Sequence, residues 1–189
     1  MSDTVELGTT LEELAENLSC DSRRIRQKAA AALCGMAKDD PASVLPAGPA
    51  ILDALNRPEA RTRWECLDIL TLLVPVDSRF CDKALSGAET ALFDEDNGTV
   101  RLSAFRFLCK LGATTLKRAD KAWLLLDEAL QCYHGDLEYN DMLAAAAVFA
   151  SGKASADVKQ KLVDRVSFDA KNGRGPLQRK SQAIIDNAS

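Results

Sequence analysis

Hydrophobic residues recur along this chain at intervals of three and four, the spacing that places them on one face of an α-helix. The clearest stretch is 22–37, whose apolar positions are Ile25, Ala29, Ala32, Leu33 and Met36. The same pattern returns in four later stretches, which open at Thr62, Val100, Tyr139 and Leu177. A second amphipathic stretch precedes each of these five, at 11–18, 49–56, 82–93, 120–132 and from Ser155 onward. The pattern predicts pairs of helices.

Polar and turn-forming residues separate the predicted helices. Thr10 and Glu13 have the spacing of a capping box, in which each side chain bonds the backbone of the other residue at a helix start. The first helix of the third pair is followed by Asp94-Glu95-Asp96-Asn97-Gly98, a run that favours a turn. Pro75 ends the second helix of the second pair.

The helix pairs repeat at a nearly constant period. Alignment of Arg26, Arg63, Arg101, Asn140 and Gln178 gives spacings of 37, 38, 39 and 38 residues. Such a period is typical of two-helix solenoids. We therefore expect an all-α fold, a right-handed α-α superhelix (solenoid) of about five HEAT-like two-helix repeats. It would form a single domain over 1–189, with repeats at roughly 10–38, 47–75, 82–112, 120–151 and 155–188.

The amino-acid sequence of the second helices resembles that of the HEAT-repeat (HEAT/armadillo-like) family. Residues 21–36 and 94–112 each show an acidic turn, an apolar residue followed by arginine (Ile25-Arg26 and Val100-Arg101), then small residues and a glycine. The resemblance implies a ladder of turn acids and helix arginines between neighbouring repeats. Its acids would be Asp21, Asp96 and Asp136 and its bases Arg26, Arg63 and Arg101, weakening where Asn140 and Gln178 replace arginine.

The composition of the chain argues against several classes of function. The six cysteines are scattered without a CxxC motif, which argues against a zinc site and a disulfide framework. A single histidine, His134, leaves little material for nucleophile–histidine catalysis, and we expect it to have a structural or surface role. No cofactor, no metal and no enzymatic activity are therefore expected. Without a leader-like or membrane-length apolar run, a reduced, cytoplasmic setting is expected, with no membrane partner.

A helical wheel points to a candidate binding surface. The stripe opposite the Ile25-type face of each second helix would line the concave side of a solenoid, and it turns apolar in the middle repeats. We expect a partner to contact Trp64, Leu67, Leu102 and Phe105, with Arg63, Arg101 and Arg106 binding its acidic side chains. The alternative is that tight curvature closes the groove, so that these apolar residues are simply core.

These features favour a non-enzymatic scaffold or adaptor that binds a protein segment in its concave groove, with an acidic amphipathic segment as the natural guest. A different class remains open, because some HEAT-like proteins bind DNA or act as alkylpurine DNA glycosylases. The net charge of −4 speaks against nucleic acid as a partner. A third alternative is that the apolar stripe joins two copies in a homodimer.

Overall fold

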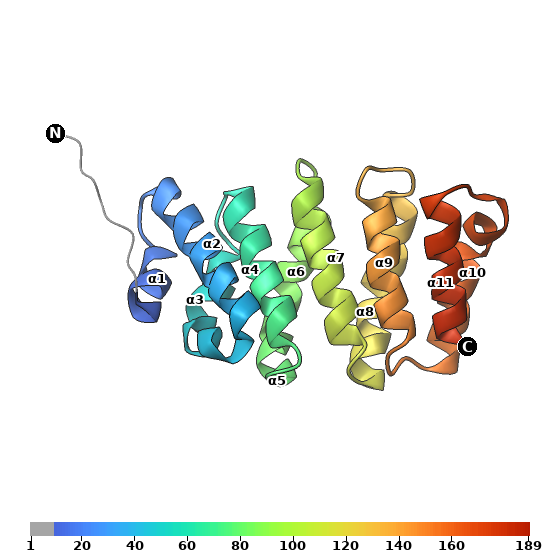
Figure 1. Cartoon of the computed structure of the whole chain (residues 1–189), viewed down its shortest axis with the longest axis horizontal. Helices are drawn as coiled ribbons and strands as arrows, with labels where there is room; N and C mark the ends of the chain where they lie inside the picture. The colour runs from blue at the N-terminus through green and yellow to red at the C-terminus, as the bar shows by residue number, and fades with distance from the viewer. Residues whose placement is uncertain (1–9) are drawn as a thin grey trace. The chain divides into compact units, whose positions relative to one another are not determined.

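A computed structural model describes residues 10–189, and over this range the chain is helical without any strand (Figure 1). The chain divides into two compact units, one ending at Ala91 and the other covering Leu92–Ser189. Each unit is built from antiparallel helix pairs, as the hydrophobic period predicts.

The first unit contains two helix pairs and nearly all of the first helix of a third pair. Its elements are α1 (Leu11–Asn17), α2 (Arg23–Asp39), the 3-10 helix η1 (Pro41–Ala47), α3 (Gly48–Ala54), α4 (Ala60–Leu73), α5 (Ser78–Cys81), η2 (Asp82–Ala84) and α6 (Leu85–Leu92). The second helices α2 and α4 pack along each other, while α1 packs on α2 and α3 on α4.

The predicted capping box at the start of α1 is confirmed. The Thr10 hydroxyl accepts a hydrogen bond from the Glu13 backbone N–H at 3.2 Å, and the Glu13 carboxylate accepts one from the Thr10 N–H at 3.1 Å. Two of the four N–H groups that a helix start leaves unpaired are therefore satisfied by two side chains.

The first helices predicted for the second and third pairs, 49–56 and 82–93, are observed as α3 and as η2 continuing into α6, and each follows a short element that was not predicted, η1 and α5. Pro46 lies inside η1 and Pro49 is the second residue of α3. Because proline lacks the N–H that a continuous helix needs, η1 and α3 do not form one helix. The third pair begins with α5, where the Asp77 carboxylate accepts from the Phe80 N–H at 2.9 Å, and continues through η2 into α6.

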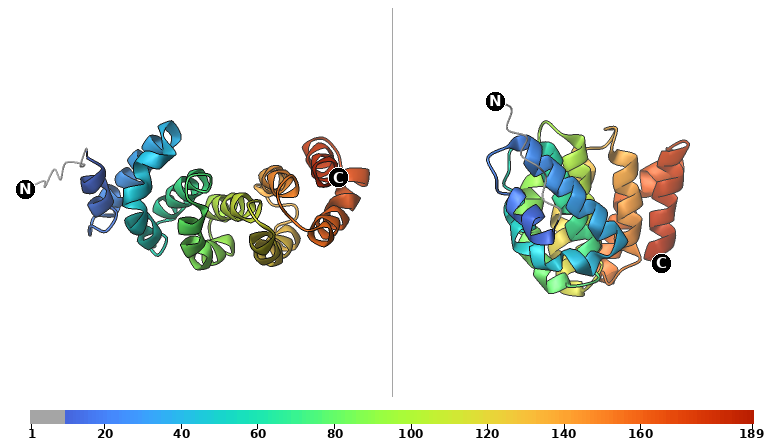
Figure 2. Two further views of the ribbon diagram at one scale, coloured as in Figure 1. Left: turned by 90° about the horizontal axis from the view of Figure 1, so that it is seen from below. Right: turned by 60° about the vertical axis from the view of Figure 1, so that its left-hand side comes forward.

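The second unit is more regular. It contains α7 (Gly98–Gly112), α8 (Leu116–Cys132), α9 (Tyr139–Ala150), α10 (Ala156–Asn172) and α11 (Pro176–Ala188). Within this unit α7 packs on α8 and α9, and α11 packs on α9 and α10. Viewed along the helices, α8 and α10 lie on one side of the unit and α9 and α11 on the other (Figure 2).

Two glycines allow close packing in the second unit. A Cβ on Gly112 would lie 2.8 Å from the ring of Phe149 and 2.9 Å from the Ala122 Cβ. A Cβ on Gly152 would lie 2.6 Å from the Cα of Ala113, whose carbonyl accepts a hydrogen bond from the Lys153 N–H at 2.9 Å. The loop after α9 is thereby held against the loop after α7.

Candidate functional site

The seven residues predicted to bind a partner divide into three groups. Trp64 and Leu102 are half-buried and Arg106 is exposed. Leu67 and Phe105 are fully buried, so the prediction that they lie exposed on a concave surface is wrong. Arg63 and Arg101 are both engaged within the chain. The alternative, that part of the apolar stripe is core, holds for Leu67 and Phe105.

The error arises from the width of the buried face. At 100° per residue, the buried positions of α4 from Thr62 to Leu73 cover an arc of about 160°, and those of α7 cover about 240°. A wheel drawn from one helix allows for a single packed stripe. It does not say how many neighbours cover the same helix, and Leu67 and Phe105 lie within the wider arcs.

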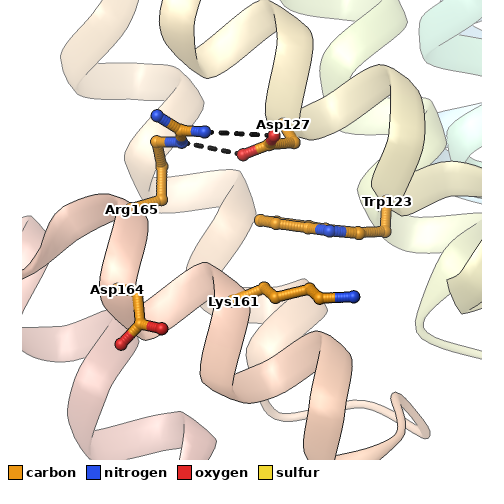
Figure 3. Close-up of a pocket in the computed structure, with 5 residues that line it drawn as sticks. All are labelled: Trp123, Asp127, Lys161, Asp164 and Arg165. Carbon is orange, nitrogen blue, oxygen red and sulfur yellow. Dashed lines mark hydrogen bonds and ion pairs between the residues drawn. The ribbon is translucent and has the colours of Figure 1, made fainter.

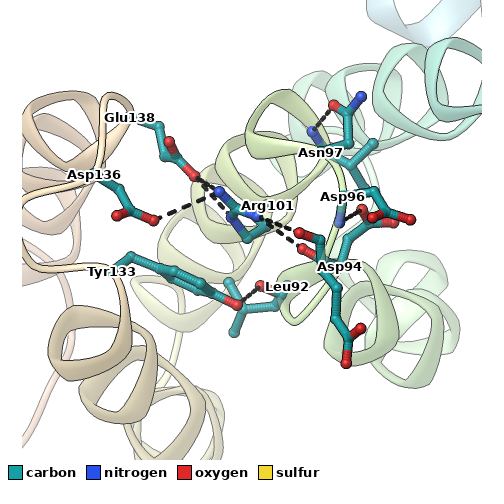
Figure 4. A network of polar contacts seen from close by, with 10 residues as sticks. Leu92, Asp94, Asp96, Asn97, Arg101, Tyr133, Asp136 and Glu138 are labelled. Atoms are coloured by element: carbon teal, nitrogen blue, oxygen red, sulfur yellow. Dashed lines mark hydrogen bonds and ion pairs between the residues drawn. The ribbon is translucent and has the colours of Figure 1, made fainter.

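Arg101 is the centre of a polar network that holds the second unit together (Figure 4). Its Nε donates to Glu138 at 2.7 Å, its Nη1 donates to the Asp94 carbonyl at 2.9 Å, and Asp136 lies 3.6 Å from Nη2. The guanidinium also stacks 4.7 Å from the ring of Tyr133. With its charge and donors used inside the protein, Arg101 is not available to a ligand, contrary to the prediction.

The first unit has an equivalent contact at Arg26. This arginine forms an ion pair with Glu59, and both side chains are largely buried, at 11% and 3% exposed. It also donates to the backbone carbonyls of Cys20 and Asp21 at 2.6 and 2.9 Å. Arg26 therefore ties the turn before its own helix to the start of the next second helix.

The predicted arginine ladder thus exists, but most of its acids are different residues. Glu59 and Glu138 are the N-cap residues of α4 and α9, immediately before the helix rather than in the acidic turn. Of the predicted acids, Asp136 faces Arg101, and Asp21 contributes only its carbonyl. Asp96 is exposed, and its own N–H donates to the Asp94 carboxylate. Arg26 and Glu59 are 33 residues apart and Arg101 and Glu138 are 37 apart, so no single spacing in the sequence identifies the acid of each pair.

Other pairs join the C-terminal helices, where arginine is missing from the ladder position. Arg165 on α10 binds Asp127 on α8 through two hydrogen bonds of 2.7 and 3.1 Å. Lys180 on α11 lies 3.1 Å from Asp141 on α9. In contrast, the buried Oδ1 of Asn140 has no hydrogen-bond donor within the described range.

One exposed surface in the second unit combines apolar and basic side chains, and we call it the α7–α9 surface. It consists of Leu102 and Arg106 on α7 and Ala144 and Val148 on α9, four positions that lie opposite the buried faces of these two neighbouring helices. The Val148 side chain is 44% exposed. Neither Arg106 nor the exposed Lys110 one turn later is hydrogen-bonded or ion-paired within residues 10–189.

A pocket of about 320 Å³ lies between α8 and α10 (Figure 3). Trp123 from α8 and Lys161 and Asp164 from α10 line it, together with the Asp127–Arg165 pair. In Figure 3 the flat indole of Trp123 lies between that ion pair and the Lys161 side chain.

A second pocket, of about 270 Å³, adjoins the first through Arg165 and holds the single histidine. The Nε2 of His134 lies 3.0 and 3.2 Å from the two carboxylate oxygens of Asp169, and its ring is 4.8 Å from that of Tyr139. Burial raises the pKa of Tyr139 to about 12, and the negative charge of Asp169 adds to this effect. The His134 side chain is 53% exposed.

The cysteines are present as thiols. Cys34, Cys66, Cys81 and Cys109 are buried, Cys20 is half-buried and Cys132 is exposed. Burial raises the pKa of Cys34 to about 12, and a hydrogen bond with Glu65 adds to the increase. Within residues 10–189, no group of three histidine, cysteine, aspartate or glutamate side chains is placed to hold a metal ion. None of the helices in that range has both the length and the apolarity needed to span a bilayer.

No protein-family model and no curated protein sequence matches the chain. Among solved structures, it is similar to a designed armadillo repeat protein in complex with the peptide (KR)4, with a TM-score of 0.78 and 17% identity over 95% of this chain and 82% of that one. A computationally designed armadillo repeat protein for modular peptide recognition matches with a TM-score of 0.73 and 18% identity, covering 95% and 82% of the two chains. An engineered protein matches at 0.74 and 15%, covering 94% and 78%. The predicted armadillo/HEAT-like solenoid fold is thereby confirmed.

Proposed function

We propose that this armadillo/HEAT-like chain is a non-enzymatic scaffold whose second helices bind an acidic segment of a protein partner. The observation that carries the proposal is the unpaired charge of Arg106 and Lys110 beside the apolar Leu102 on α7. The ladder arginines of the second helices, Arg26 and Arg101, are neutralised internally. Free positive charge on α7 is thus concentrated where an apolar side chain is also accessible.

The α7–α9 surface suits a segment that carries both acidic and apolar side chains. Arg106 can bind a carboxylate through two parallel hydrogen bonds, which gives orientation as well as attraction. The small Ala144 allows a partner backbone to approach α9, and Leu102 and Val148 offer apolar contact on either side. Half-buried Trp64, on α4 of the first unit, offers a separate aromatic contact.

Two further features of the chain fit this role. The neighbouring structures include designed proteins made for peptide recognition, so the fold is one that can present a peptide-binding face. Four buried thiols, with no disulfide among them, fit a reducing cytoplasmic setting.

Selection from a random peptide display library tests the proposal without the partner having to be identified first. We expect selected peptides to be rich in aspartate or glutamate next to leucine or phenylalanine. Arg106→Glu should weaken a selected peptide at least about tenfold, because it reverses the charge that faces the ligand's carboxylate. Leu102→Ala should weaken it less.

Lys121→Glu is the matched control, because Lys121 is also an exposed cation but lies on α8, outside the α7–α9 surface. Basic or purely apolar peptides, or an equal effect of both charge reversals, would contradict the assignment. Sedimentation of the free protein identifies the competing outcome, in which two copies of the chain associate through these residues.

A further inference from the structure

The pocket that holds His134 has a buried carboxylate in its wall. We call it the Asp169 pocket, and its lining includes Gln131, His134, Tyr139, Phe168 and Asp169. The Asp169 side chain is only 7% exposed. Removing a carboxylate from water costs free energy unless donors or a positive charge replace the lost hydration.

The donors available to Asp169 inside the protein are few. A carboxylate can accept about four hydrogen bonds. In the part of the chain that is described, its oxygens contact a single side-chain donor, Nε2 of His134, which lies 3.0 and 3.2 Å away. His134 is itself 53% exposed, so the remaining acceptor capacity of Asp169 lies next to a ring that solvent reaches. Hydrogen-bonding capacity of the Asp169 carboxylate is therefore left over in this pocket.

Aromatic rings complete the site. Phe168 precedes Asp169 on α10 and is 73% exposed, which is unusual for so large an apolar side chain. Tyr139 packs against His134. Ring faces attract cations, and a planar guanidinium can stack on a ring while its N–H groups bind a carboxylate.

The positive charge of Arg165, which also lines the pocket, does not oppose a cation strongly. Its guanidinium is bound by Asp127 through two short hydrogen bonds, as Figure 3 shows. The Asp127–Arg165 pair is therefore close to neutral, and Asp169 is the remaining carboxylate in the wall of the pocket.

We propose that the Asp169 pocket binds an arginine side chain of a protein partner, with the guanidinium stacked on Phe168 and hydrogen-bonded to Asp169. This site is lined by α8, α10, His134 and the first residue of α9, Tyr139, whereas the proposed acidic segment binds exposed residues further along α9 and on α7. The two sites take ligands of opposite charge and are independent of each other. A partner that used both would carry a basic anchor apart from its acidic segment.

Titration of the full chain with N-acetyl-arginine methylamide, followed by 15N–1H NMR, tests the site directly. We expect saturable shifts of the amide signals of His134, Tyr139 and Phe168, with a dissociation constant on the order of millimolar for so small a ligand. N-acetyl-citrulline methylamide has nearly the same shape without the charge and should produce shifts at least about tenfold weaker.

Variants separate the contribution of the Phe168 ring from that of the Asp169 carboxylate. Phe168→Ala should weaken binding by about threefold to thirtyfold, as expected for loss of a cation–π contact. Leu124→Ala is its matched control, since Leu124 is 72% exposed on α8 and is not part of the pocket lining. Asp169→Asn should abolish saturable shifts, while Asp164→Asn, an exposed acid on the same helix, should leave them unchanged.

Shifts spread evenly over acidic positions, equal binding of the citrulline compound, or equal effects of Phe168→Ala and Leu124→Ala would overturn the proposal. If Asp169→Asn proves unfolded, the comparison of the two exposed apolar variants still decides it. The outcome of the arginine titration does not bear on the α7–α9 surface, because that surface is tested with acidic peptides.

Discussion

At the scale of single residues, the sequence predicts the positions of the ladder arginines correctly but does not predict whether their charges are free. Their positions follow from the repeat period, because Arg26 and Arg101 occupy the same slot in their helices. Their use does not follow, since whether a guanidinium is free depends on acids 33 and 37 residues away. Arg106, outside the ladder slot, is the predicted cation that stays exposed.

The Arg26–Glu59 pair gives a prediction at this scale. Arg26→Ala leaves Glu59 buried without its counter-ion, so the free energy of unfolding should fall by about 3–5 kcal/mol, measured by urea denaturation. The double variant Arg26→Met, Glu59→Leu should recover much of this loss, because no charge then remains buried.

Arg57→Ala serves as the comparison for the buried pair. Arg57 forms a surface pair with Asp53 at 3.1 Å, and its loss should cost less than about 1 kcal/mol. Equal destabilisation by Arg26→Ala and Arg57→Ala would show that burial does not set the strength of the first pair.

At the scale of helices, hydrophobic periodicity predicts the helices of each pair but not the short elements η1 and α5 that precede α3 and α6. A second helix such as α7 is long, carries a continuous apolar face and begins at Asn97, whose side chain caps the helix. The region of η1 and α3 contains three prolines within nine residues, Pro41, Pro46 and Pro49, so local backbone chemistry outweighs periodicity there.

Close helix packing gives the second prediction. Gly112→Ala should destabilise the protein by about 1–3 kcal/mol, because its methyl group meets the Phe149 ring and the Ala122 Cβ, and Phe149 is too buried to move aside. Gly35→Ala is the control, since Gly35 lies within α2 with no atom within 4 Å of the added methyl. That change should raise the melting temperature slightly, as alanine favours the helix by about 0.5–1 kcal/mol.

At the scale of the whole molecule, the sequence predicts the fold but not which surface is exposed. The repeat period was sufficient to predict the armadillo/HEAT-like solenoid, because every repeat restates the same pattern. The exposure of the candidate surface could not be predicted, because it depends on how completely neighbouring helices cover Leu67 and Phe105.

Charge at this scale predicts that the chain does not bind duplex DNA. The net charge is −4, and Arg26, Arg101 and Arg165 are paired with acids rather than free for phosphates. Fluorescence anisotropy with a labelled duplex at about 50 mM salt should show no saturable binding at micromolar protein. Binding that weakens steeply with added salt would instead support the DNA-binding alternative.

The contact between Gly152 and Ala113 determines where foreign sequence can be introduced. The hydrogen bond from Lys153 to Ala113 and the lack of room for a Cβ fix the length of both loops at that end of the second unit. At the opposite end, Gly175 is exposed, with no atom within 4 Å of an added Cβ. An epitope tag or a fluorophore-labelling sequence should therefore be tolerated beside Gly175 and should disrupt the helices if placed after Gly152.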